Sequence, residues 1–143
     1  MNLLKLQSIL THPILITDEN MIDYLIGQRF STGERFLGLL ISSKSVQLFL
    51  NNLFPTVITE FEVIRFSDTD DVIKILNKKL TALDLSVDKA MRAEFLLKLM
   101  TLNPNLHVHI DVLADYVRSI KDASEQALMI ESSKINDQVM SQV

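Results

Sequence analysis

The sequence lacks cysteine and tryptophan and holds only three glycines and three prolines in 143 residues. Without cysteine there is no disulfide framework, no thiolate nucleophile and no cysteine-based zinc site, which agrees with a reducing, cytoplasmic location. Neither G-x-G-x-x-G nor G-x-x-x-x-G-K-[ST] occurs, so a Rossmann or P-loop nucleotide site is disfavoured. Three histidines limit metal chemistry further.

Two other absences exclude membranes and nucleic acid as partners. The densest apolar run, residues 36–41, is far shorter than the ~20 residues that cross a bilayer. Lys5 interrupts the N-terminal apolar stretch, and no small-residue cleavage site follows it. The net charge is −4 and the 14 basic residues are scattered, so the positive field that nucleic-acid binding requires is missing.

The sequence does hold an alternation of short strands and amphipathic helices. Apolar spacing predicts helices in 2–12, 18–27, 71–80, 91–103, 111–120 and from 122 on, and strands in 14–16, 35–42, 46–51, 59–66, 83–87 and 106–110. The run 35–42 is apolar throughout, which is typical of a central strand buried on both faces. This order, with one hairpin inserted, predicts an α/β fold: a mixed sheet of about six strands with helices on both faces.

A domain boundary is expected near residue 121. Residues 1–121 form one domain, whereas 122–143 predict a helix that starts at a capping box, Asp122 with Glu125. Its apolar stripe is thin, being limited to Leu128, Ile135 and Val139. No loop or cap follows before Val143, so the helix looks cut in mid-element, and we expect it to be a connector.

The sharpest metal-like pattern is His107-Val108-His109. Residues two apart on a strand point the same way, so the two imidazoles could share an ion, and Asp111 extends the alternation. Two ligands do not make a site, however, and the polar face of a half-exposed strand has the same pattern. We favour the polar face.

One interpretation of the three acids Asp68, Asp70 and Asp71 is a general acid/base cluster. Their place before a helical stripe favours the other interpretation, helix capping. G-x-S-x-G is absent, and no serine has a recognisable histidine and acid arrangement. The residues themselves therefore nominate no catalytic, cofactor-binding or metal-binding side chain.

The loop 27–35 is a better candidate for function. It carries two arginines, an acid and an aromatic residue between two glycines, and joins two buried elements. Loops of this composition often contact ligands or partners, although an ordinary solvated connection is an equal alternative.

Three stretches resemble the creatinase/prolidase family, which includes Xaa-Pro dipeptidases and aminopeptidase P. Arg118-Ser-Ile-Lys-Asp122, followed by Glu125 and Leu128-Met129, resembles that family's R-x-I-K-[S/D]-x-x-E-x-x-L-M junction. Asn20 to Gly27 resembles its N-x-x-Y-L-T-G segment, and Gly33-Glu34-Arg35 resembles the start of a strand in its bacterial dipeptidases. Ile26, Gln28 and Ser132-Ser133 depart from the family pattern.

The resemblance implies the non-catalytic N-terminal domain of a proline-specific dipeptidase or aminopeptidase. Catalysis then belongs to a C-terminal domain that holds two divalent metal ions, and this chain alone is expected to be inactive and to carry no cofactor. The expected partners are that domain, a second copy in a homodimer, and short proline-containing peptides. In this family the domain helps to wall the neighbouring subunit's active-site entrance. Our candidates for that gate or interface are Arg29, Phe30, Glu34, Arg35, Asn52 and Phe54.

Two alternatives stay open. One is a stand-alone interaction or small-molecule-binding module. The other is the same domain from a non-peptidase, creatinase-like relative.

Overall fold

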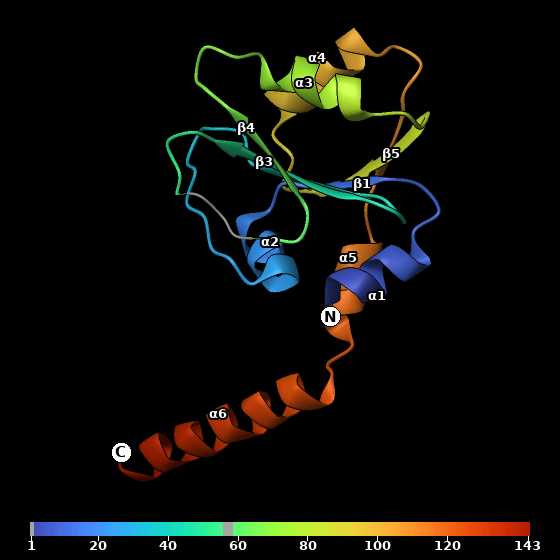
Figure 1. The fold of residues 1–143 in the computed structure, drawn as a ribbon. Coiled ribbons are helices and arrows are strands. Elements are labelled where there is room, and N and C mark those ends of the chain that lie inside the picture. Colours follow the sequence, from blue (N-terminus) through green and yellow to red (C-terminus); the bar gives the residue numbers. More distant parts are fainter. Residues whose placement is uncertain (1, 56–58) are drawn as a thin grey trace.

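The computed structural model describes residues 2–55 and 59–143 as an α/β domain followed by a long helix (Figure 1). The elements in chain order are α1 (Asn2–Ile9), β1 (Ile14–Ile16), α2 (Glu19–Ile26), β2 (Gly38–Ile41), β3 (Val46–Asn51), β4 (Glu62–Phe66), α3 (Val72–Lys79), β5 (Asp84–Val87), α4 (Ala93–Leu102), β6 (His107–Ile110), α5 (Leu113–Ser119) and α6 (Ala123–Ser141).

The strands form one mixed sheet in the order β4-β3-β2-β1-β5-β6. β2 pairs antiparallel with both β1 and β3, while β1–β5, β5–β6 and β3–β4 are parallel pairs. Five strands therefore run in one direction and β2 runs against them. Their carboxyl ends lie at one edge of the sheet, together with the start of β2.

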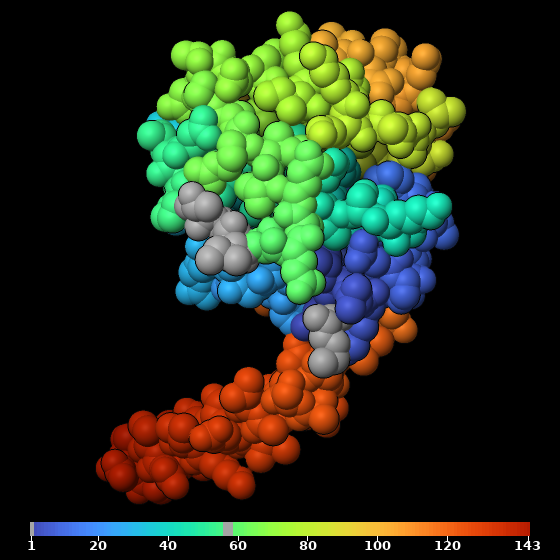
Figure 2. All heavy atoms as spheres, in the orientation of Figure 1, coloured from blue at the N-terminus to red at the C-terminus, as the bar shows by residue number. Residues whose placement is uncertain are grey.

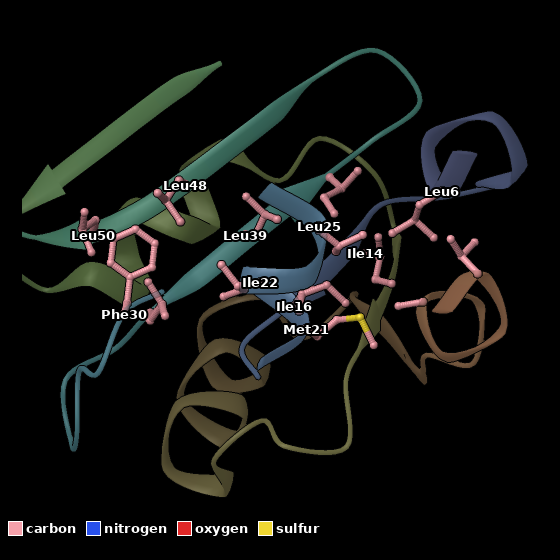
Figure 3. Packing of buried hydrophobic residues seen from close by; sticks show 14 residues of the cluster. Leu6, Ile14, Ile16, Met21, Ile22, Leu25, Phe30, Leu39, Leu48 and Leu50 are labelled. Atoms are coloured by element: carbon pink, nitrogen blue, oxygen red, sulfur yellow. The ribbon is translucent and has the colours of Figure 1, made fainter. Parts of the chain in front are cut away.

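Helices cover both faces of the sheet: α1, α2 and α5 pack on one face, and α3 and α4 on the other (Figure 1). The central strands send alternate side chains into two cores, as the two-residue period of a strand requires. Ile14 and Ile16 join the first core and Leu15 the second, and all three are fully buried. Figure 3 shows the first core. The predicted fold class is confirmed.

Local end signals place the helices where the sequence predicts them. Asp18 caps α2 by accepting a hydrogen bond from the Met21 amide at 2.8 Å, and Gly27 ends it at φ 70°. Asp71 caps α3, and Asp122 with Glu125 forms the expected capping box of α6. Each side chain satisfies amides that lack a partner within the helix.

Several details differ from the prediction. The strand expected over 35–42 is shorter, Gly38–Ile41, because residues 32–35 form a turn. The strand expected over 59–66 covers Glu62–Phe66 and is an edge strand. Leu83, Tyr116 and Ile120, apolar residues of the predicted strand 83–87 and helix 111–120, are more than half exposed. Leu83 precedes β5, Ile120 follows α5, and α5 packs through Ala114 and Val117 instead.

Helix α6 extends away from the rest of the chain (Figures 1 and 2). None of its 19 residues is buried. No helix in the described part of the chain is both long enough and apolar enough to cross a membrane. The division into 1–121 and 122–143 stays a prediction.

Candidate functional site

The loop that joins α2 to β2 lies at the edge where the carboxyl ends of five strands meet. Three neighbouring segments hold it. The Glu19 carboxylate accepts hydrogen bonds from the Thr32 amide and hydroxyl, at 2.9 and 3.1 Å. Arg92, just before α4, donates to the Glu34 carbonyl at 3.0 Å. Gly33 adopts φ 60°, a conformation that glycine reaches without strain. These contacts therefore fix the conformation of the loop.

The third attachment is an ion pair between Arg35 and Asp68. Arg35 Nε and Nη2 donate to Oδ1 and Oδ2 of Asp68, at 3.0 and 3.1 Å. Asn51 Nδ2 donates to the same Oδ1 at 2.8 Å. The sequence predicts a capping role for Asp68; the structure corrects this, since Asp71 is the cap and Asp68 links two loops.

The turn after β3 is anchored from both sides. Asn51 is 1% exposed, and its Oδ1 accepts the Leu53 amide at 3.0 Å. The Arg65 guanidinium donates to the carbonyls of Asn52, Phe54 and Pro55. Through Asp68 the structure thus brings Arg35 together with the turn that holds Asn52 and Phe54.

The remaining predicted residues lie in different surroundings. Arg29 is 82% exposed and pairs with Asp23 on the adjacent helix, Nη2 to Oδ2 at 3.0 Å. Glu34 is exposed. Phe30 differs from the expectation of an accessible loop side chain, because it is 8% exposed and belongs to the first core near Leu50 (Figure 3). Its apolar ring fills the core beneath the loop.

A small pocket of about 80 Å³ opens beside the loop. Arg35, Arg92 and Glu19 line it together with the rings of Phe36 and Phe95. These two rings meet edge to face, with centroids 5.2 Å apart. The pocket can accept a small group that is both apolar and hydrogen-bonding, but not a whole substrate.

The charges at this edge are suited to binding rather than to proton transfer. Hydrogen bonds from Arg35 and then Asn51 hold the pKa of the Asp68 carboxyl below its ordinary range, and the same pairing raises the pKa of Arg35. Both groups stay ionised at neutral pH. A general acid or base needs a pKa near the working pH, so neither residue fits that role.

The two histidines of the predicted metal pattern point to the same side of β6, as their spacing requires. Both lie near the carboxylate of Asp84: His109 Nε2 is 2.8 Å from Oδ1, and His107 Nδ1 is 3.7 Å from it. These contacts, led by the His109 hydrogen bond, lower the pKa of Asp84. Among residues 2–55 and 59–143, no group of three or more His, Asp or Glu is placed to hold a metal ion.

Sequence reasoning missed the residues that fix the loop, namely Glu19, Asn51, Asp68 and Arg92. One signal was available: Asn51 ends an apolar strand, and a buried amide must find hydrogen-bond partners. The partner of Asp68, by contrast, is 33 residues away and depends on the tertiary fold.

Comparison with known proteins supports the fold. No family model and no curated protein matches the sequence. Among solved structures, the dipeptidase from Pyrococcus horikoshii OT3 is 24% identical, with a TM-score of 0.81 over 99% of this chain and 43% of that one. The recombinant prolidase from Thermococcus sibiricus is 21% identical, with a TM-score of 0.85 over 98% and 42%.

A shorter structure also matches, the creatinase/prolidase N-terminal domain of an X-Pro dipeptidase from Streptococcus pyogenes. It is 17% identical with a TM-score of 0.66, over 77% of this chain and 98% of that domain. The resemblance noted in the sequence is therefore confirmed at the level of the fold. The chain spans less than half the length of the dipeptidase and the prolidase that it matches.

Proposed function

We propose that this chain, which has the fold of a creatinase/prolidase N-terminal domain, is the non-catalytic N-terminal part of a Xaa-Pro dipeptidase or aminopeptidase. In that protein it associates with a second subunit and limits access to the active site. The observation that carries the proposal is the pattern of coverage. The chain matches dipeptidases almost end to end while spanning about two-fifths of their length.

Helix α6 supports the proposal. The longer dipeptidases cover 98–99% of this chain, whereas the isolated N-terminal domains cover 77–84% of it. The share left out, 16–23% of the 143 residues, is large enough to include the 19 residues of α6. Its exposed apolar side chains, Leu128, Ile135 and Val139 among them, would become buried against a C-terminal domain.

The catalytic metals of the proposed enzyme would be held by that C-terminal domain. Two divalent ions would activate a water and polarise the scissile carbonyl there. We assign no described residue of this chain to those ions. Its contribution is to shape the entrance.

The fixed loop and turn supply that shape. Arg29, Glu34 and Asn52 are exposed, and Arg35 is 44% exposed while held by Asp68. A wall fixed in advance loses little conformational entropy when a substrate meets it. Arginine side chains on such a wall suit the free carboxylate of a short peptide. We leave Phe30 out of the gate because its ring is buried.

The first test is the coding sequence downstream of Val143. The proposal requires a continuous reading frame for a C-terminal domain with the carboxylates and histidine of a two-metal site. A stop codon at that point would favour a stand-alone module.

The second test is steady-state kinetics of the longer protein on a Leu-Pro dipeptide with manganese. We expect Arg29→Ala, Arg35→Ala and Asn52→Ala to raise KM or lower kcat while thermal melts stay near wild type. Lys44→Ala is the matched control, since Lys44 lies in the exposed β2–β3 turn. Wild-type kinetics in all three variants would show that the loop and turn take no part in the mechanism. Kinetic losses accompanied by equally large falls in melting temperature would show that these residues serve folding instead.

A further inference from the structure

A second pocket lies where two neighbouring parallel strands send their connections to opposite faces of the sheet. β1 leads to α2 on one face, and β5, paired parallel with β1, leads to α4 on the other. Because the two connections diverge, a crevice opens beyond the carboxyl ends of these strands. In open α/β sheets, ligands bind at such switch points.

The pocket has a volume of about 140 Å³. Ile16, Met21 and Ala114 give it an apolar floor, and charged side chains surround them. This space equals roughly five water molecules at ~30 Å³ each. It is too small for a nucleotide or a drug-sized molecule, whose sites are about 300 Å³ or more.

One face of α5 supplies charges of both signs. Asp111, Asp115 and Arg118 are spaced by four and three residues, so they lie along one side of the helix and its entry, and all three line the pocket. Along α5 and its entry the acidic groups come first and the guanidinium last, while Lys89 lies beside Asp115.

The acidic side has an excess of negative charge. Asp111 is 8% exposed, and its carboxylate accepts the amides of Leu113 and Ala114 at 2.9 and 3.1 Å. Burial, with smaller contributions from the nearby carboxylates of Asp115 and Asp88, raises the pKa of Asp111. Four carboxylates line the pocket against two cations, so a positively charged group would be attracted there.

One of the two cations that line the pocket is available to a ligand. Lys89 is paired with Asp115, Nζ to Oδ2 at 3.0 Å. The Arg118 guanidinium lies 5.9 Å from the Tyr24 ring centroid, and within the described part of the chain it forms neither an ion pair nor a hydrogen bond. An anionic ligand group can therefore bind it bidentately without displacing a protein carboxylate.

We propose that this pocket binds a small zwitterion of the α-amino-acid class, with its ammonium group toward Asp111 and its carboxylate toward Arg118. A metal ion fits less well, because none of the described acids and histidines converge in threes as coordination requires. An ammonium group needs only single hydrogen bonds. This inference is independent of the proposed peptidase role.

The test uses the 143-residue chain, ¹⁵N-labelled, titrated with L-alanine and followed by amide chemical shifts. We expect saturable shifts in 88–90 and 111–118, with a Kd of roughly 1 mM for a ligand of six heavy atoms. Acetate and methylamine, each carrying one half of the zwitterion, should bind about 10-fold more weakly or worse.

Arg118→Gln should weaken alanine binding about 10-fold and leave methylamine binding unchanged. Asp115→Asn should weaken both. Lys44→Gln is the control, an exposed basic residue outside the pocket, and should bind alanine like the wild type. Absence of saturable shifts in the folded wild type, equal binding of alanine and acetate, or full affinity in Arg118→Gln would each overturn the proposal.

Discussion

Asp68 accepts two hydrogen bonds from the Arg35 guanidinium, Nε to Oδ1 at 3.0 Å and Nη2 to Oδ2 at 3.1 Å. Because Asn51 donates to the same carboxylate, this pair connects the loop after α2 with the turn after β3. Two segments that are far apart in the sequence thereby become one surface.

Removing the ion pair should loosen the loop without unfolding the chain. Arg35 and Asp68 are 44% and 56% exposed, and such pairs add little to global stability. In Arg35→Ala and in Asp68→Asn, we expect faster amide exchange over 31–36 and nearly unchanged melting temperatures. Lys44→Ala is the control. Unchanged exchange in both variants would show that Glu19 and Arg92 hold the loop by themselves.

The same pair predicts how the loop responds to acid. The pKa of Asp68 is lower in the folded chain than the ordinary value of 3.8, so the unfolded chain takes up this proton first. The stabilisation is therefore complete above that value and is lost as pH falls through the lower folded pKa. The amides of residues 31–36 should stay protected against hydrogen exchange down to pH 3.8, and their protection should decline below that pH. In Asp68→Asn this transition should disappear, and its persistence there would assign it to another carboxyl.

Phe30 should matter for stability. Phe30→Ala leaves a void in the first core, and buried Phe→Ala changes cost about 3–5 kcal/mol. Phe30→Leu keeps most of the apolar volume and should cost clearly less. Urea unfolding of both variants measures the difference. A loss below ~0.5 kcal/mol for Phe30→Ala would instead be typical of a surface residue.

The sequence predicts those features of the fold that depend on neighbouring residues. Asp18, Asp71 and the Asp122–Glu125 box mark helix starts because each caps amides within the next turn. Phe30 was misplaced for a related reason: a lone aromatic residue in a polar loop carries no periodicity that would indicate burial. The partner of Asp68 could not be predicted either, since it depends on how β3, β4 and the loop pack.

The histidines should bind no catalytic metal. His107 and His109 both lie near Asp84, but within 2–55 and 59–143 no three such side chains are placed to hold an ion, and three or more converging ligands are usual for a divalent ion. Isothermal titration of the chain with zinc or manganese should show no stoichiometric binding, and the chain should not hydrolyse Leu-Pro. Tight binding that disappears in the double variant His107→Ala, His109→Ala would establish a site at β6 after all.

Helix α6 should be the least stable element of the isolated chain. None of its residues is buried, so no apolar burial offsets the entropy of ordering it. An isolated helix of this length is marginal in water, and its capping box adds only about 1 kcal/mol. Amide exchange beyond residue 124 should be fast, and a chain ending at residue 121 should melt at the same temperature as the full chain.

Asp122→Ala should lower helical circular dichroism without shifting that temperature, whereas Leu76→Ala, a core change in α3, should shift it. Sedimentation must confirm a monomer, because a second copy packed on Leu128 and Ile135 would also slow exchange. Protection in α6 equal to that of β2 in a proven monomer would show that α6 belongs to the domain, and that the boundary at residue 121 is wrong.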